Sequence, residues 1–196
     1  MYENFSGIIL AGGENKRFDG IIKSLSYIDG KQIVKRIILV LEQLFPEIII
    51  VTNLPGEFRE FSRFKIVSDK IIGKGPLGGI HAGLEAAANE LCFVIAGDMP
   101  FPDRDIIKGM IDEFSDSEPE LLIPKLGSGI EPLHSIWQRK INQKLESFLL
   151  SGDRNAVRDF IKTADIKYYE IQESESARIA FTNINYLKDI VSPHKF

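Results

Sequence analysis

Residues 7–23 have the sequence Gly-Ile-Ile-Leu-Ala-Gly-Gly-Glu-Asn-Lys-Arg-Phe-Asp-Gly-Ile-Ile-Lys, in which an apolar run opens into a glycine-rich loop. The apolar run, which ends at Leu10, predicts a buried strand of a parallel sheet. Ala11 joins this strand to Gly12 and Gly13, where the missing Cβ atoms let the backbone turn sharply and approach a ligand closely. Backbone N–H groups in such a loop point at anionic oxygens, so the stretch predicts a phosphate-binding site.

Two basic residues of the same stretch, Arg17 and Lys23, supply positive charge for such a ligand. The loop is not a Walker A motif, because that motif has its glycine directly before Lys-Ser or Lys-Thr, and here other residues separate Gly20 from Lys23. The alternative interpretation is a solvated surface lysine for Lys23 and a surface ion pair for Arg17. The loop pattern favours phosphate binding by Lys23.

The chain has 196 residues, of which 44% are hydrophobic, enough for one well-packed core. We therefore expect a single domain over residues 1–196. The 24 basic and 28 acidic residues give a net charge of -4, which provides no general attraction for nucleic acid. No apolar run has the length of a membrane helix, and Cys92 lies in an apolar run that indicates a buried, reduced thiol. The expected location is the cytoplasm, with no membrane partner.

The chain alternates between patterns typical of strands and of amphipathic helices. This alternation predicts an α/β fold of three layers, α/β/α, around a mostly parallel, Rossmann-like sheet. Residues 91–96 form the most hydrophobic run and are expected to be a central strand, and the second half of the chain is expected to cover the sheet. Besides the first strand, we expect strands at 48–52, 64–67, 91–96, 121–123, 132–137, 168–171 and 179–181, and helices at 31–44, 76–89, 106–114, 141–150, 156–162 and after Asn185.

Polar residues follow three of the predicted strands, namely Asn53, Asp69 and Asp98. Because the carboxyl ends of parallel strands meet at one edge of a sheet, we expect these residues to share a crevice with the first loop. Asp98 is the candidate metal ligand, since Mg²⁺ accepts one carboxylate when phosphate oxygens and water complete its coordination. The alternative is that Asp98 caps the helix expected after Pro102.

The first loop resembles a signature of nucleotidyltransferases with the sugar-nucleotide pyrophosphorylase-like fold, and most closely that of molybdenum cofactor guanylyltransferases. Residues 10–13, Arg17 and Lys23 match this signature in type and spacing. Phe18 and Asp19 depart from it, because they stand where the signature has methionine and glycine. The Asp19 carboxylate places a negative charge inside a phosphate-binding loop.

Three further segments resemble the same family and occur in its order: residues 75–80 (Gly-Pro-Leu-Gly-Gly-Ile), 97–101 (Gly-Asp-Met-Pro-Phe) and 183–185 (Asn-Ile-Asn). In the first segment, Gly78 lies near a helix start, where N–H groups face an anion or a base edge, although small residues there also permit close packing. In the last segment an asparagine amide orients a phosphate or a metal-bound water, or else Asn185 caps the final helix.

The resemblance implies an enzyme that takes GTP and molybdenum-molybdopterin, joins GMP to the terminal phosphate of the pterin and releases pyrophosphate, with Mg²⁺ as cofactor. It implies a nucleotide-binding part at about residues 1–115 and a second-substrate side at about 116–196, where Arg154 and Arg158 approach the pterin phosphate. It also implies transient contact with other molybdenum cofactor proteins. The implied catalytic residues are Lys23, Asp98 and Arg17, the implied metal ligand is Asp98, and the implied GTP-binding residues are Leu10, Ala11, Gly12, Gly13, Lys23, Asn53, Asp69, Gly78 and Asp98.

Other functions stay open. A molybdenum cofactor cytidylyltransferase or a sugar-phosphate nucleotidyltransferase would share the phosphate site, and Asp19 would suit a nucleotide-binding protein without catalysis. Residues 73–78 also fit the Gly-x-Gly-x-x-Gly pattern of an NAD-dependent dehydrogenase, with Asp98 in the position of the ribose-binding acid. Against a dehydrogenase, polar residues 68–70 interrupt the strand that should lead into that glycine pattern.

Overall fold

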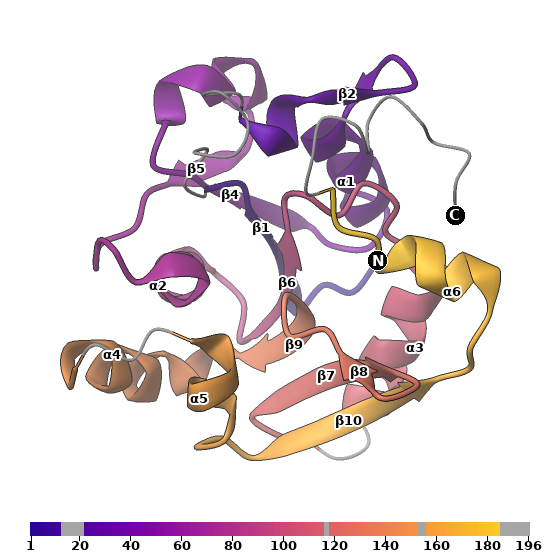
Figure 1. Ribbon diagram of the computed structural model, residues 1–196. Coiled ribbons are helices and arrows are strands. Elements are labelled where there is room, and N and C mark those ends of the chain that lie inside the picture. Colours follow the sequence, from indigo (N-terminus) through magenta and orange to yellow (C-terminus); the bar gives the residue numbers. More distant parts are fainter. Residues whose placement is uncertain (13–21, 116–117, 153–155, 185–196) are drawn as a thin grey trace.

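The computed structural model describes residues 1–12, 22–115, 118–152 and 156–184 (Figure 1). Among these residues, the main sheet has eight strands: seven follow the order β10-β7-β9-β6-β1-β4-β5, and β8 pairs with β7. The strands are β1 (Phe5–Leu10), β4 (Glu47–Val51), β5 (Lys65–Val67), β6 (Leu91–Ala96), β7 (Leu121–Leu126), β8 (Gly129–Ile130), β9 (His134–Gln138) and β10 (Ile166–Ile171). The helices are α1 (Ile33–Leu41), α2 (Gly75–Ala86), α3 (Arg104–Ser115), α4 (Asn142–Leu150), α5 (Val157–Ile161) and α6 (Glu175–Ala180).

The sheet is mostly parallel, as predicted. Strand β1 pairs in parallel with β4 and β6, and β5 and β10 join their neighbours in parallel as well. Strand β9 is antiparallel to both β6 and β7, so β6 and β7 run in the same direction. The carboxyl ends of β1, β4, β5, β6 and β7 therefore lie at one edge of the sheet. Strand β6 is central, as its apolar composition predicted.

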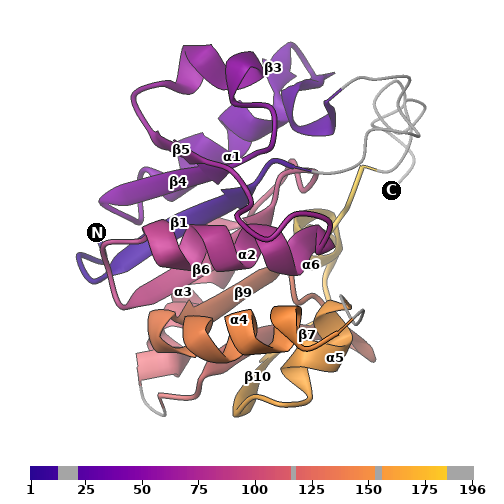
Figure 2. The same ribbon diagram turned by 90° about the vertical axis from the view of Figure 1, so that its left-hand side faces the viewer.

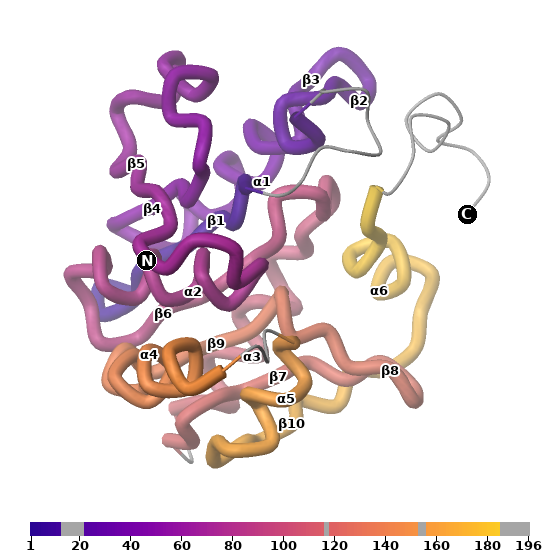
Figure 3. The backbone as a smooth tube through the Cα atoms, turned by 60° about the vertical axis from the view of Figure 1, so that its left-hand side comes forward, coloured from indigo at the N-terminus to yellow at the C-terminus, as the bar shows by residue number. Residues whose placement is uncertain are grey.

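Helices cover both faces of the sheet and make the three predicted layers. Helices α2, α4 and α5 pack on one face and α1 and α3 on the other (Figure 2). Helices α2 and α4 contact each other along that face (Figure 3). Side chains of β1 alternate between the two cores, because successive residues of a strand point to opposite faces: Phe5 and Ile9 enter the core under α1 and α3, and Ile8 and Leu10 the core under α2.

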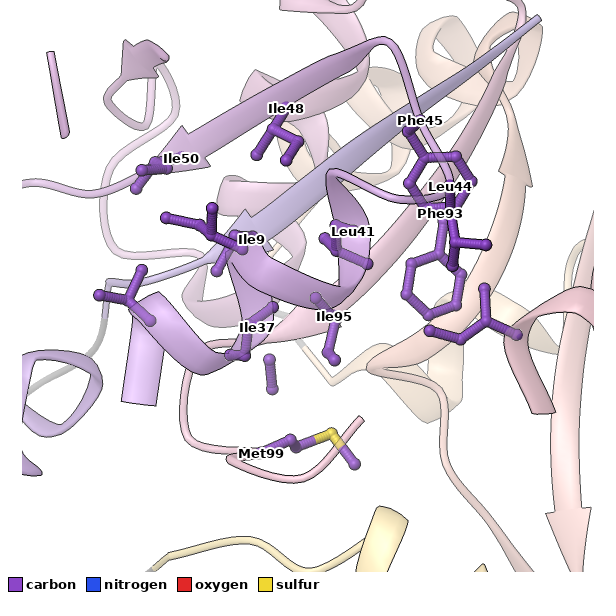
Figure 4. Packing of buried hydrophobic residues seen from close by; sticks show 14 of the residues in the cluster. Ile9, Ile37, Leu41, Leu44, Phe45, Ile48, Ile50, Phe93, Ile95 and Met99 are labelled. Carbon is purple, nitrogen blue, oxygen red and sulfur yellow. The ribbon is translucent and has the colours of Figure 1, made fainter. Parts of the chain in front are cut away.

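One of the two cores extends to the carboxyl edge of the sheet. Ile9, Ile37 and Ile95 pack there with Met99, whose side chain is fully buried (Figure 4). Met99 lies just beyond the end of β6. Burial of this side chain holds the turn after the strand in place, so the residue next to it has a defined position.

The second half of the chain adds β7, β9 and β10 to the sheet, where strands were expected at 121–123, 132–137 and 168–171. Its helices α4 and α5 cover one face of the sheet, as expected, and it differs from expectation at one element. The predicted strand at 179–181 is wrong, because the residues up to Ala180 belong to α6. Ser174 caps that helix by accepting the N–H of Ala177 at 3.1 Å, and Ala177 and Ala180 are buried at helical spacing. A short apolar triplet does not distinguish strand from helix.

Several element boundaries also shift. The helix expected at 31–44 begins at Ile33, because Tyr27–Ile28 and Lys31–Gln32 pair as a small antiparallel hairpin, β2 and β3. The helix expected after Asn185 lies outside the described residues. Among the described helices, none has the length and apolar character needed to cross a membrane.

Candidate functional site

Lys23 and Asp98 form an ion pair at the carboxyl edge of the sheet. Lys23 begins a short 3₁₀ helix that follows the first loop, and Asp98 follows the end of β6. The Lys23 Nζ atom lies 3.5 Å from Asp98 Oδ2, and the side chains are 26% and 27% exposed. A cation and a carboxylate from distant parts of the sequence therefore face the same partly open space.

The backbone around Asp98 is held from two directions. The buried Met99 side chain anchors the turn, and the Met99 N–H donates to the Ala96 carbonyl at 3.3 Å. The Ile184 N–H donates to the Asp98 carbonyl at 2.9 Å, which brings the segment after α6 against this turn. Burial raises the pKa of Asp98, and the nearby Lys23 ammonium opposes that rise.

Gly97 allows the turn after β6 to pack directly against the end of β1. Its N–H donates to the Leu10 carbonyl at 2.9 Å. A Cβ atom at Gly97 would lie 2.8 Å from the Leu10 carbonyl oxygen, 3.1 Å from Ala11 Cα and 3.2 Å from Ser24 Cβ. The position therefore requires glycine, and its contacts join three segments: the end of β1, the residue after Lys23 and the Asp98 turn.

Asn53 and Asp69 also meet, at the ends of β4 and β5. The Asn53 amide donates to Asp69 Oδ2 at 3.0 Å, and the Asp69 N–H donates to Asn53 Oδ1 at 3.0 Å. This reciprocal pair joins the loops that follow the two strands. It lies on the β4–β5 side of β1, while Asp98 lies on the β6 side.

Gly78 is closely packed in the first turns of α2. A Cβ atom there would lie 2.9 Å from the Ile71 carbonyl oxygen and 3.5 Å from Asp69 Oδ2. Glycine thus lets the loop after β5 close over the start of α2 and brings a carboxylate near the positive end of the helix. The packing reason for a small residue at Gly78 is therefore visible in the structure.

The other predicted residues divide between described and undescribed parts of the chain. Leu10 and Ala11 are buried, and the Ala11 N–H donates to the Val51 carbonyl at 2.8 Å; Gly12 lies directly after them. The helix after Pro102 is capped by Asp103, which accepts the N–H of Asp105 at 2.8 Å, so Asp98 does not cap it. The residues named in the sequence analysis that lie outside the described ranges are Gly13, Arg17, Phe18, Asp19, Gly20, Arg154 and Asn185.

Sequence reasoning missed Glu131, which lies between β8 and β9. Burial raises the pKa of its carboxyl group, while hydrogen bonds from the Leu133 N–H and the Asn183 side chain lower it. The charge of Asp98 raises this pKa further, and that of Arg158 lowers it, so both groups are within electrostatic reach. The only sequence signal was an acidic residue directly before the strand expected at 132–137.

The structure does not favour the dinucleotide-binding interpretation of residues 73–78. Strand β5 ends at Val67, and α2 already begins at Gly75. The last glycine of the pattern lies inside the helix and is covered by the Ile71 carbonyl. These glycines therefore do not form the turn that leads directly from a strand to a pyrophosphate.

A mostly parallel sheet that brings Gly12, a lysine and a strand-end aspartate to its carboxyl edge is typical of α/β proteins that bind nucleotides. The family model of the MobA-like NTP transferase domain matches residues 7–169. A "Probable molybdenum cofactor guanylyltransferase" of Natranaerobius thermophilus is 32% identical over 202 residues, covering 100% of this chain and 98% of that protein. A protein of Peptoclostridium acidaminophilum with the same name is 37% identical over 195 residues, covering 94% and 86%.

A solved structure agrees with these relationships at the level of the fold. The molybdopterin-guanine dinucleotide biosynthesis protein A from Archaeoglobus fulgidus superimposes with a TM-score of 0.80 at 23% identity, and the match covers 95% of each chain. The chain belongs to the family of MobA-like NTP transferase domains. It is accordingly an enzyme of the nucleotidyltransferase class, and the dehydrogenase alternative is set aside.

Proposed function

We propose that this chain transfers GMP from GTP to the terminal phosphate of molybdenum-molybdopterin, forming the molybdopterin guanine dinucleotide cofactor and pyrophosphate. The observation that carries the proposal is the Lys23–Asp98 pair, 3.5 Å apart at the edge where the first glycine loop ends. The guanylyltransferase names of relatives at 32% and 37% identity support the choice of substrates.

The reaction requires that the two substrates be positioned and that the charge of their phosphates be neutralised. The terminal phosphate of the pterin is already anionic and nucleophilic, so its attack on the α-phosphorus of GTP needs no strong base. The Lys23 ammonium faces the space in which pyrophosphate departs and stabilises the charge that develops there. Backbone N–H groups of the first loop, at Gly12 and Gly13, bind phosphate oxygens, and Arg17 adds a second positive charge.

Asp98 suits a divalent cation, and we propose Mg²⁺. Its carboxylate is a hard oxygen ligand and is partly exposed, and the Lys23 ammonium opposes the rise in pKa that burial causes. In the described residues, no three His, Cys, Asp or Glu side chains cluster to enclose a metal, so phosphate oxygens and water would complete the coordination. When bound, the ion supplies charge neutralisation at the reacting phosphates.

The two substrates approach from opposite sides of Asp98 in this proposal. The nucleotide lies toward β4 and β5, where Asn53, Asp69 and Gly78 border the loops, and the pterin lies toward β7. Residues 1–115 thus serve the nucleotide and 116–196 the second substrate, within one domain. The reaction takes place in the cytoplasm, with transient contact to other molybdenum cofactor proteins.

Pyrophosphate release tests the function. The enzyme is incubated with each of the four NTPs and Mg²⁺, together with molybdenum-molybdopterin, with a sugar phosphate or with neither acceptor. The proposal expects release only with GTP and the pterin together. Release with CTP as the only accepted NTP would favour a cytidylyltransferase. Release that needs a sugar phosphate would favour a sugar-phosphate nucleotidyltransferase. No release with any NTP would favour a nucleotide-binding protein.

Asp98→Asn tests the assigned role with nearly unchanged shape. We expect turnover to fall by about a hundredfold or more, because the anionic metal ligand is lost, while the melting temperature stays close to that of the wild type. Asp105→Asn, which removes an exposed carboxylate on α3, is the matched control and should keep wild-type turnover. Near-normal Mg²⁺-dependent turnover of Asp98→Asn would contradict the assignment.

A further inference from the structure

A small cleft opens beside the β7–β8 hairpin. Figure 3 shows this hairpin and α6 on the same side of the molecule. Its volume of about 180 Å³ is large enough for a bicyclic ring and too small for a whole nucleotide. The lining residues are Pro124, Leu126, Gly129, Ile130, Glu131 and Phe181. The walls are thus apolar or aromatic, and Glu131 is the one charged side chain among these lining residues.

The aromatic wall of this cleft is held rigidly. The Phe181 ring packs edge-on against the His134 ring, with centroids 4.8 Å apart, and His134 packs in the same way against Phe93 at 5.0 Å. His134 is fully buried, so this row of rings anchors Phe181 to the sheet. A flat ligand that enters the cleft meets a preformed aromatic surface, which favours planar heterocycles.

Hydrogen bonds hold both the backbone and the carboxylate of Glu131. The Glu131 carbonyl accepts the His134 N–H at 3.1 Å, and the Glu131 N–H donates to the Pro124 carbonyl at 3.1 Å. Among the described residues, the Leu133 N–H and the Asn183 side chain donate to the carboxylate. An ionised carboxylate has about four acceptor positions, so two further N–H donors from a ligand fit.

The position of the cleft assigns it to the second substrate. Asn183, which bonds Glu131, precedes Ile184, whose N–H bonds the Asp98 carbonyl at 2.9 Å, so the cleft adjoins the Asp98 turn. It lies on the β7 side of β6, while the Asn53–Asp69 pair lies beyond β1 on the other side. A nucleotide held toward β4 and β5 therefore leaves this cleft to the acceptor.

We infer that Glu131 determines specificity for the pterin, because its carboxylate can accept the N3–H and the 2-amino group of an aminopyrimidinone ring seated against Phe181. The inference rests on the proposed function for the identity of the second substrate. Beyond that function, Glu131 recognises one edge of the substrate ring. A ring with two adjacent N–H donors binds, and a ring that presents a carbonyl oxygen at the 2-position is rejected. Rejection arises because that oxygen would face the carboxylate without a hydrogen bond.

Two synthetic probes test this recognition without catalysis: 6-hydroxymethylpterin monophosphate and 6-hydroxymethyllumazine monophosphate, which differ at the 2-position. Binding to the full chain is measured by fluorescence quenching or calorimetry. The wild type should bind the pterin probe about tenfold or more tightly than the lumazine probe, the size expected for an unpaired buried polar group. Equal affinities of the wild type for the two probes would overturn the inference without any variant.

Glu131→Gln should lose or reverse the preference, because an amide can donate to the lumazine oxygen. Glu170→Gln, on β10, removes an exposed carboxylate that pairs with Lys125 and should keep the wild-type preference. A Glu131→Gln protein that retains the wild-type preference would overturn the inference. GMP transfer is scored separately: a chain that discriminates the probes but transfers no GMP keeps this inference and loses the proposed function.

Discussion

Substitution of Gly97 by alanine tests whether the contact between β1 and the Asp98 turn is as close as the structure shows. The new Cβ atom would lie 2.8 Å from the Leu10 carbonyl oxygen and 3.1 Å from Ala11 Cα. Both atoms belong to backbone, so neither can rotate away. Relief of the clash requires a shift of about half an ångström between the two strand ends, which would also weaken the Gly97 N–H bond to Leu10.

The expected cost follows from these two effects. Overpacking of a closely packed site costs about 1–3 kcal/mol, and a weakened backbone hydrogen bond adds about 1 kcal/mol. The free energy of unfolding should therefore fall by about 2–4 kcal/mol, which corresponds to a melting temperature lower by about 5–15 °C for a chain of this length. Because Asp98 directly follows Gly97, its displacement from Lys23 should also lower turnover about tenfold to a hundredfold.

Urea unfolding and the pyrophosphate-release assay measure the two outcomes. Gly56→Ala is the matched control, because a Cβ atom there meets nothing within 4 Å. That variant should stay within about 0.5 kcal/mol of the wild type and keep full turnover. If Gly97→Ala behaved like Gly56→Ala in both assays, the claim that this contact positions Asp98 would be refuted.

Two further predictions concern Lys23 and His134. Lys23→Met should lower kcat by about a hundredfold to a thousandfold because a cation facing the departing pyrophosphate is lost. Lys35→Met, on the exposed face of α1, is the control and should retain the wild-type kcat. Equal kcat values for the two variants would exclude the role given to Lys23. Burial lowers the pKa of His134 from 6.5 to about 3, so the folded state resists protonation and stability is lost as the pH falls below 6.5 toward 3. In urea unfolding, the wild type should lose up to about 1.4 kcal/mol per pH unit more than His134→Leu over that window, and parallel curves would show that His134 titrates normally.

Much of the fold follows from local patterns. The apolar run before Gly12 and the run at 91–96 are β1 and β6, because a buried parallel strand needs a short continuous apolar segment wherever it sits in the sheet. Asp98 could be recognised from the sequence as a candidate site residue for a similar reason, because a carboxylate at the end of a buried strand contributes little to packing there. The local pattern predicted a strand at 179–181, but the Ser174 cap and the burial of Ala177 and Ala180 stabilise a helix there.

The site was only partly predictable. Glu131 was missed because its importance lies in its neighbours, Asn183 and Asp98, which are distant in sequence. Gly97 was named only as part of the segment 97–101, and only the position of the Leu10 carbonyl explains why no side chain fits there.

The sequence alone determined most of the order of strands and helices and the acidic residue at the end of β6, because each depends on residues that are close together in the chain. The tertiary structure decided which of these meet. It inserted β9 antiparallel between β6 and β7, and it brought the Lys23 ammonium to 3.5 Å from the Asp98 carboxylate. Such contacts depend on how whole elements pack across the sheet, and burial of the two cores sets that packing.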